Sequence, residues 1–505
     1  MRIGILEAIR RKDYWSVLVG LLPFAVFAVA FVLLLRPIGL RFGSDDTAHI
    51  DAIHSMGVFG WVWMRATTWQ PRLVSDLGFA ALLFNLRIWK ILDAGLMAAL
   101  VWMVTRTALF GEPVEPDHPK TSRARFILLA LFVVPMFFLI HPNVIASGSI
   151  WYGGSFYYLW LLMPMFIGMA PFLLAFYGKR LPWQPVTLPV CVFFAVVACF
   201  TEQTAAVQFG MMALVFAWML FRREPIPRYL IAPAVIIAVA TIVFFYFDMT
   251  SVRMKIHPDL QYFPEFAGFS FLDKLTLGVN AYTTHLLHIS NVLFAVLTIM
   301  TGWLVFRQTN RWYLRILAFV PGLWVLVNTV PLPFGYTPGE VELHKRPGAL
   351  GFGIGDWLTY VWGNAPMADV KGITTTPALV LLAVAALLCF LSVFWLIYRS
   401  FSEPRDRYIA LALYLAAFLS GLLNGFSPSV WGSGNRPYFV SDFLLLLILA
   451  MLLRSRMPSP DHAGGEFSLR TSWPARIWLV VLVIYACYMW YLYHTVFATN
   501  WFWWY

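Results

Sequence analysis

The sequence predicts an all-α polytopic membrane protein with about 13 transmembrane helices and a membrane-parallel helix in the first outer loop. Hydrophobic residues make up 60% of its 505 residues and the mean hydropathy is +0.73, values that exclude an ordinary soluble chain. Apolar runs long enough to cross a bilayer recur along the chain, with short basic segments between them. We therefore expect residues 1–505 to form a single transmembrane domain with no separate soluble domain.

The first apolar run, 16–35, follows a basic N-terminal segment, MRIGILEAIRRKDYW. About 20 apolar residues are enough to span the hydrocarbon core. No small-residue cleavage site follows this run. The arrangement is typical of an uncleaved signal anchor whose N-terminus lies in the cytoplasm.

Ten further runs have lengths suited to spanning helices. In chain order they are residues 77–104, 126–142, 157–177, 229–247, 289–306, 316–331, 377–398, 408–424, 438–453 and 477–497. Aromatic residues make up 17% of the chain, which fits a protein with an extensive membrane–water interface.

The run 186–221 is predicted to form a helical hairpin. A single helix of that length would be about 50 Å long, far more than the hydrocarbon core requires. The segment CFTEQTAA also interrupts the run and places Glu202 near its middle. A hairpin puts the basic segments GKRLPW and FRREPIPR on the same side, as the positive-inside rule requires. The hairpin brings the expected number of spans to thirteen.

The basic residues predict the orientation of the chain. The net charge is +11, but Lys and Arg fall in short clusters between apolar runs, so topology explains them better than nucleic-acid binding does. Every predicted cytoplasmic connection carries Lys or Arg, whereas the longer loops lie on the opposite face. We therefore expect a multi-pass membrane protein with its functional site on the outer face.

Two adjacent carboxylates, Asp45 and Asp46, follow the first span on the outer face. One interpretation is that they begin a helix, because its unpaired N–H groups and dipole stabilise carboxylates. The other is that one carboxylate acts as a general base while its neighbour raises its pKa or holds an acceptor hydroxyl. Ile50, Ile53 and Met56 would give this helix an apolar face along the membrane surface.

The residues that follow this pair could instead bind a metal: they are His49, Asp51 and His54. His49 and Asp51 point to different faces of a helix, so only Asp51 and His54 have the i, i+3 spacing. A solvated helix face is therefore favoured over a metal site. No metal or other cofactor is expected.

The segment 61–72 combines tryptophans with arginines at the membrane interface. Trp69 offers an indole on which a sugar ring can stack, and Arg72 offers a guanidinium that binds phosphate. An aromatic belt with headgroup-binding arginines is the alternative interpretation.

The loop 143–158 is rich in glycine, serine and aromatic residues, which allows the backbone to approach a ligand closely. Its Trp151, Tyr152 and Tyr158 are candidates for the wall of a substrate site. Glu202 is expected at the outer tip of the hairpin, where a carboxylate in apolar sequence needs a partner.

Arg436 is the only positive charge in the predicted outer loop 424–437 and lies immediately before a span. A guanidinium near the acyl boundary suits a lipid-linked phosphate. A snorkelling interface arginine is the alternative.

The ordered motifs SDD…WQPR, GSIWYGGSFYYLW, TEQT, SVRMK and FSP…NRPYF, between residues 44 and 439, resemble the GT-C superfamily of integral-membrane glycosyltransferases. The similarity is to a bacterial branch of that superfamily and extends over most of the chain. It implies a multi-pass protein of the bacterial inner (plasma) membrane with its active site on the periplasmic face. The resemblance implies an inverting transfer of a sugar from a polyprenyl-phosphate-linked donor to a glycan or glycolipid acceptor of the cell envelope. One departure is that no sizeable soluble C-terminal domain is visible, which leaves the acceptor open.

The resemblance also implies roles for particular residues. Asp45 or Asp46 would deprotonate the acceptor hydroxyl. Arg436, with Arg253 or Lys255, would neutralise the leaving polyprenyl phosphate, so no general acid is needed. The expected substrate-binding residues are Arg72, Trp69, Trp151, Tyr152, Tyr158, Glu202 and His257. Many members of the superfamily work without a metal, whereas some with pyrophosphate donors need a divalent cation.

Two other functional classes are compatible with a polytopic chain. A membrane polysaccharide polymerase or ligase would share the outer arginines and loops, but its pyrophosphate-linked donor does not require an acidic pair. A lipid-linked glycan transporter would need polar groups along a route through both leaflets, and the inner half of the predicted spans carries few.

Overall fold

The computed structural model describes residues 14–40, 45–112, 119–250, 266, 268–289, 291–329, 377–427, 435–457 and 473–498. All regular secondary structure in this part of the chain is helical, which confirms the prediction of an all-α protein. The chain divides into two compact units. Unit 1 comprises Met1–Pro142, Ala146–Met249 and Leu446–Trp501, and unit 2 comprises Asn143–Ile145, Thr250–Leu445 and Phe502–Tyr505.

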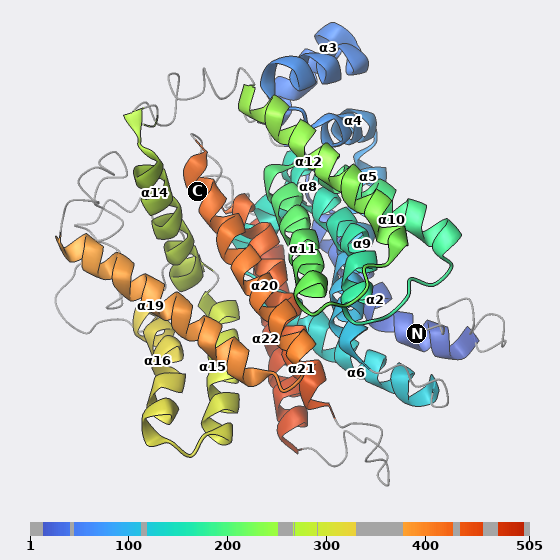
Figure 1. The fold of residues 1–505 in the computed structure, drawn as a ribbon. Coiled ribbons are helices and arrows are strands. Elements are labelled where there is room, and N and C mark those ends of the chain that lie inside the picture. The colour runs from blue at the N-terminus through green and yellow to red at the C-terminus, as the bar shows by residue number, and fades with distance from the viewer. Residues whose placement is uncertain are drawn as a thin grey trace. The chain divides into compact units, whose positions relative to one another are not determined.

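Unit 1 contains most of the described helices (Figure 1). They are α2 (Tyr14–Leu35), α3 (Asp45–Met64), α4 (Leu73–Leu82), α5 (Leu86–Ala108), α6 (Pro119–Met136), α8 (Tyr152–Tyr157), α9 (Leu159–Phe176), α10 (Gln184–Ala198), α11 (Glu202–Phe221), α12 (Ile231–Thr250) and α22 (Trp473–Ala498). Two π-helical turns, η1 (Arg65–Trp69) and η4 (Ala146–Ile150), lie in the same unit.

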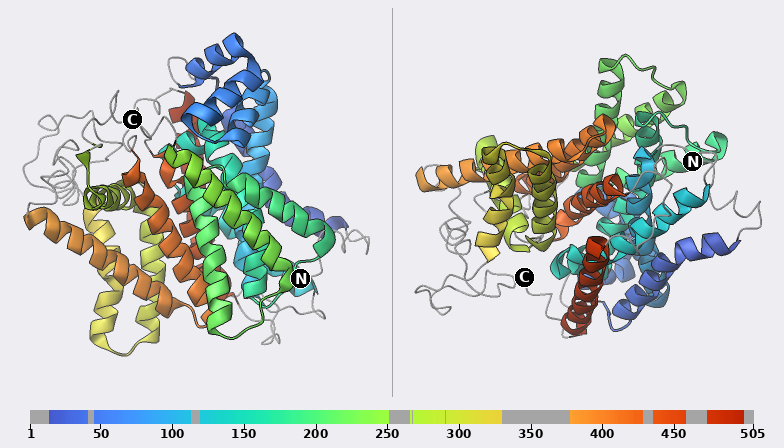
Figure 2. Two further views of the ribbon diagram at one scale, coloured as in Figure 1. Left: turned by 45° about the horizontal axis from the view of Figure 1, so that its top comes forward. Right: turned by 90° about the horizontal axis from the view of Figure 1, so that it is seen from below.

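Unit 2 is built from α14 (Phe271–Thr284), α15 (Asn291–Gln308), α16 (Trp312–Thr329), α19 (Pro377–Ser400) and α20 (Pro404–Leu422). The helix α21 (Phe439–Arg456) begins in unit 2 and continues into unit 1 after Leu445. Figure 2 gives two further views of these helices.

Eight helices in the described residues are long and apolar enough to cross a membrane, or up to ten if each of two bent helix pairs counts as one span. The helices 184–198, 312–323 and 387–400 are apolar but shorter. The described part of every predicted run is largely helical, so the chain has the character of a multi-pass membrane protein. The number of helices that cross the bilayer stays a prediction.

Two predicted runs have different boundaries in the structure. The run 77–104 is divided, because α4 ends at Leu82 and α5 begins at Leu86. The side chain of Asn85 caps α5 by accepting a hydrogen bond from Ile88 N. The run 126–142 ends in a bend of 92° between 123–139 and 142–150. Both breaks fall next to the segments that carry the candidate site.

The helix α9 forms the interior of unit 1. Most residues of the apolar span Tyr152–Phe176 are buried inside the protein, whereas most residues of Leu18–Leu35 in α2 are not. A Cβ on Gly168 of α9 would lie 2.7 Å from Ala195 Cα, so this glycine allows α10 to pack very closely. The helix α2 instead presents an apolar surface suited to lipid.

The run 186–221 forms two helices, as predicted. The helix α10 ends at Ala198 and α11 begins at Glu202. The side chain of Gln208 donates a hydrogen bond of 3.0 Å to the carbonyl of Ala195, so the chain folds back at the break. Glu202 therefore lies at the turn between two adjacent helices.

Unit 2 has its own buried polar core. His285 Nε2 lies 3.0 Å from Asp442 Oδ1, and the His285 ring stacks on Tyr438 at 3.9 Å between centroids. Tyr282 and Ser441 share a hydrogen bond of 2.7 Å. These contacts join α14 and the turn that follows it, His285–Ile289, to the beginning of α21, three residues after Arg436.

Candidate functional site

The acidic pair begins α3, and its two side chains point to different surroundings. Asp45 is exposed, whereas Asp46 is fully buried. The indole Nε1 of Trp151 donates a hydrogen bond of 3.0 Å to Asp46 Oδ2. The sequence predicts both residues for the site, and the structure brings them together although they are 105 positions apart in the chain.

Gly153 packs against the other oxygen of the buried carboxylate. A Cβ built on Gly153 would lie 2.8 Å from Asp46 Oδ1 and 3.2 Å from the ring of Trp151. Only a residue without a Cβ lets the first turn of α8 approach the carboxylate this closely. The composition of the glycine-rich loop predicts a close approach of its backbone to a ligand. In the structure, the backbone at Gly153 approaches the Asp46 side chain of the protein itself.

We predict that Gly153→Ala lowers the free energy of unfolding by about 1–3 kcal/mol, because the added methyl overpacks the space beside Asp46. Thermal unfolding of the purified protein measures the change. Gly95→Ala is the matched control, since Gly95 lies within α5 and a Cβ there meets nothing within 4 Å. Equal melting temperatures for the two variants would contradict the close approach.

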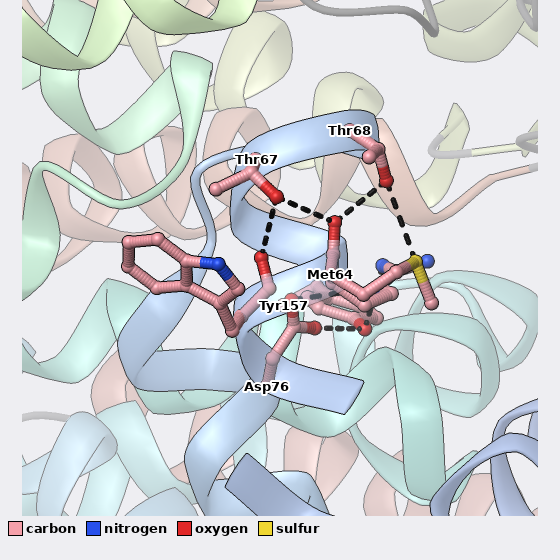
Figure 3. Close-up of polar contacts among 7 residues, drawn as sticks. Met64, Thr67, Thr68, Asp76 and Tyr157 are labelled. Atoms are coloured by element: carbon pink, nitrogen blue, oxygen red, sulfur yellow. Dashed lines mark hydrogen bonds and ion pairs between the residues drawn. The ribbon is translucent and has the colours of Figure 1, made fainter. Parts of the chain in front are cut away.

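A buried cluster of three side chains lies between α4, η1 and α8 (Figure 3). Tyr157 Oη donates a hydrogen bond of 2.7 Å to Asp76 Oδ1 and accepts one of 3.2 Å from Arg65 Nη2. Arg65 Nε lies 3.4 Å from Asp76 Oδ2. The three groups close a triangle in which the guanidinium compensates the charge of the buried carboxylate.

The π-helical turn η1 places Arg65 in this cluster. Gln70 N donates to Arg65 O at 2.9 Å, so the turn contains one residue more than an α-helical turn. The hydroxyls of Thr67 and Thr68 donate to the carbonyls of Trp63 and Met64 at 2.8 and 2.6 Å. Figure 3 shows Thr67, Thr68 and Met64 at this turn. The wider turn directs both Arg65 and Gln70 into buried polar clusters.

A second cluster joins the segment after η1 to α11 and α12. Arg72 Nη2 lies 3.0 Å from Glu202 Oε2. Gln70 Nε2 donates to Glu202 Oε1 at 2.8 Å and to Asp248 Oδ1 at 2.9 Å. The prediction that Glu202 needs a partner is therefore confirmed, and Arg72, itself a predicted site residue, is that partner.

The two clusters meet at Tyr157. The guanidinium carbon of Arg72 lies 5.0 Å from the centroid of the Tyr157 ring, within the range of a cation–π contact. Burial alone would lower the pKa of Arg72, but Glu202 outweighs it and the pKa stands above its usual value. For the Asp76 carboxyl the effect of burial has the opposite sign. Burial raises the pKa of Asp76, and Arg65 opposes that rise. The pKa of Arg65 also stands above its usual value, so both arginines remain cationic.

His49 lies on α3 against the rings of Trp61 and Phe79, with centroid distances of 5.2 and 5.5 Å. The pKa of His49 is lowered from 6.5 to about 4. Burial is the main cause and Arg65 adds to it, whereas Asp45 opposes both. The imidazole is therefore neutral near physiological pH.

We predict that the protein loses stability as the pH falls from 6.5 to about 4 and that His49 contributes to this loss. In that window the unfolded chain binds a proton at His49 while the folded chain does not, so protonation favours unfolding. Melting temperatures measured across the window should depend less on pH in His49→Gln than in the wild type. His54→Gln is the control, because His54 is exposed on the same helix. An equal reduction in both variants would contradict the assignment.

The remaining predicted residues are distributed as follows. Tyr152 is buried, and its hydroxyl donates to the carbonyl of Phe79 at 2.5 Å. Trp69 and Tyr158 are half-buried. Arg436 begins a short 3-10 turn in unit 2. Arg253, Lys255 and His257 lie outside the described residues.

Sequence analysis missed Asp76, Gln70 and Asp248. The available signal was the one applied to Glu202, since Asp76 and Asp248 are also carboxylates in apolar surroundings that need partners. No pattern in the sequence indicated that Gln70 would join two of these carboxylates.

Within the residues that the structure describes, no group of three or more His, Cys, Asp or Glu side chains is arranged to hold a metal. Asp51 and His54 are both exposed on α3. The chemistry available in unit 1 is that of an exposed carboxylate beside a buried one, with the buried Arg65 and the half-buried Arg72 in the same unit.

Comparison of the chain with protein-family models, with curated proteins and with solved structures gave no match.

Proposed function

We propose that this protein is an integral-membrane glycosyltransferase that moves a sugar from a polyprenyl-phosphate-linked donor to a glycan or glycolipid acceptor. One observation supports this most directly. The acidic pair that follows the first span is held at the start of a helix by the glycine- and aromatic-rich loop, through Trp151 and Gly153. A carboxylate positioned in this way suits the deprotonation of an acceptor hydroxyl.

Asp45 is the proposed general base and Asp46 the positioning residue. A general base must come within hydrogen-bonding distance of the hydroxyl that it deprotonates, and Asp45 is the exposed member of the pair. Asp46 is fully buried and bonded to Trp151, so it fixes the first turn of α3. The acceptor oxygen would attack the anomeric carbon as the bond to the donor phosphate breaks, and the acceptor proton would pass to Asp45.

The residues proposed to neutralise the leaving phosphate are those that the sequence predicts: Arg436 with Arg253 or Lys255. A guanidinium can donate two hydrogen bonds to one phosphate, which stabilises the charge that grows as the sugar leaves. No metal is required for this step.

We also propose that α3 lies along the outer membrane surface. The helix is broken at Gly57, whose φ of 75° is left-handed. After the break, Phe59 and Trp63 are 82% and 70% exposed, and Met56 just before it is also exposed. Apolar side chains exposed beside the charged start of the same helix suit insertion at the level of the lipid headgroups.

The proposed topology has thirteen spans, with the N-terminus in the cytoplasm of a bacterium and Tyr505 in the periplasm. Reporter fusions at Tyr505 and within residues 458–472 test it. A periplasmic signal at Tyr505 and a cytoplasmic signal in the connection are expected. A cytoplasmic signal at Tyr505 would require an even number of spans and would contradict this topology.

The proposed activity is tested with purified protein in lipid nanodiscs and a panel of polyprenyl-phosphate monosaccharides. Release of polyprenyl phosphate that depends on an acceptor is the expected result. Joining of pyrophosphate-linked repeat units would instead identify a polymerase or ligase. Movement of a labelled lipid-linked glycan across proteoliposomes without sugar transfer would identify a transporter.

A further inference from the structure

Four exposed arginines lie at the end of unit 1 opposite α3 and α4. Arg180 is in the connector between α9 and α10, whereas Arg222, Arg223 and Arg228 are in the connector between α11 and α12. The other ends of α11 and α12 carry the contacts of Glu202 and Asp248 with Gln70, about 30 Å away along helices of 20 residues. Figure 1 shows both connectors at the same end of this helix group.

The two connectors lie within electrostatic range of each other at Tyr229. Arg180 interacts electrostatically with the Tyr229 side chain, and Arg228 is its neighbour in the chain. The Tyr229 hydroxyl is buried and has no hydrogen-bond partner among the described residues. Buried phenols almost always have such a partner, so this oxygen lacks one that a ligand could provide.

The backbone of both connectors is constrained. In the described part of the chain, Trp183 and Arg223 are the non-glycine residues with positive φ, 51° and 55°, and each connector contains one of them. Arg223 N donates to Leu220 O and Glu224 N donates to Met219 O, a pattern that ends a helix and favours glycine at the Arg223 position. The helix end alone therefore does not explain an arginine here.

The surroundings place the arginines at the boundary of an apolar surface. Trp183 and Phe221 are exposed, and so are Val186, Leu220 and Ile231 on the adjoining helix ends. Glu224 is the only carboxylate in the two connectors. Guanidinium groups next to lipid-facing side chains lie at the depth of lipid phosphates.

We propose that Arg180, Arg222, Arg223, Arg228 and Tyr229 form a binding site for the headgroup of an anionic phospholipid. The guanidiniums would donate charge-assisted hydrogen bonds to the phosphate, and the Tyr229 hydroxyl would donate one more. The exposed apolar side chains would contact the acyl chains, which a soluble phosphate lacks. Arginines close to the membrane surface attract the negatively charged headgroups of anionic lipids. The site is independent of the proposed sugar transfer.

Native mass spectrometry of the purified full chain with added phosphatidylglycerol tests the site. Arg180→Gln with Arg228→Gln should weaken retention of this lipid about 25-fold, since each arginine near lipid phosphate contributes about fivefold. Arg36→Gln with Arg87→Gln is the matched control, because both arginines are exposed at the other end of unit 1, and it should retain the lipid like the wild type. Phosphatidylcholine should bind less tightly than phosphatidylglycerol to the wild type.

Arg223→Gly separates lipid binding from folding. Glycine suits the left-handed position, so the melting temperature without lipid should be unchanged or higher, while retention of phosphatidylglycerol should fall about fivefold. Tyr229→Phe should also weaken retention without loss of folding. The proposal is overturned if the arginine variants retain the lipid like the wild type, if both lipids bind equally, or if inorganic phosphate displaces the lipid at equal concentration.

Discussion

Asp45→Asn is expected to lower the rate of sugar transfer by about 10²–10⁴-fold, the usual contribution of a positioned general base. The substitution removes the group that accepts the proton, but it keeps the shape of the side chain and its exposed position at the start of α3. The measurement is the rate of polyprenyl phosphate release at saturating donor and acceptor. The melting temperature of the variant should stay close to that of the wild type, because Asp45 is exposed.

Asp46→Asn is the matched variant for this prediction. Its amide oxygen can still accept the hydrogen bond from Trp151 Nε1, so the first turn of α3 should keep its position. We expect a smaller loss of rate than for Asp45→Asn. If Asp46→Asn abolishes transfer while Asp45→Asn does not, Asp46 is the base and the buried carboxylate must become accessible during turnover. Full activity in both variants would end the general-base hypothesis.

Arg65→Met is expected to lower the free energy of unfolding by about 3–5 kcal/mol, because it leaves Asp76 buried without a compensating cation. The Tyr157 hydroxyl also loses the guanidinium that donates to it. Thermal unfolding followed by tryptophan fluorescence measures the effect. Arg87→Met is the control, since Arg87 is exposed and its substitution should change stability little.

The double variant Arg65→Met, Asp76→Leu tests the physical reason for that loss. Replacing both members of a buried ion pair by apolar residues is often close to neutral, so most of the lost stability should return. If the double variant is as unstable as Arg65→Met alone, loss of packing at Arg65, and not an uncompensated charge, explains the effect. A stable single variant would show that Asp76 does not depend on Arg65.

The helices could be predicted from the sequence because their lengths follow from bilayer thickness and their boundaries from charge. The hairpin at Glu202 is an example, since neither the length of the run 186–221 nor its flanking arginines fitted one helix. The division at residues 83–85 could not be predicted in this way. Apolar residues flank it on both sides, and the break depends on the cap that Asn85 provides.

The candidate site could be predicted only in part. Chain order placed Asp46 and Trp151 on one face, but the hydrogen bond between them depends on a space that only Gly153 leaves open. The partner of Glu202 could be expected without being identified, because several arginines were available on the same face. Long-range pairs of this kind arise from tertiary packing, which the spacing of residues along one chain does not encode.

The π-helical turn at residues 65–69 makes the site depend on the number of residues in the chain as well as on their identity. Successive residues of an α-helix are rotated by about 100° about its axis. Deleting one residue from this turn would therefore keep Gln70 and Arg72 in the chain, but it would turn them away from Glu202 and Asp248. Related chains that differ by a single insertion or deletion here would need a different set of partners for the same carboxylates.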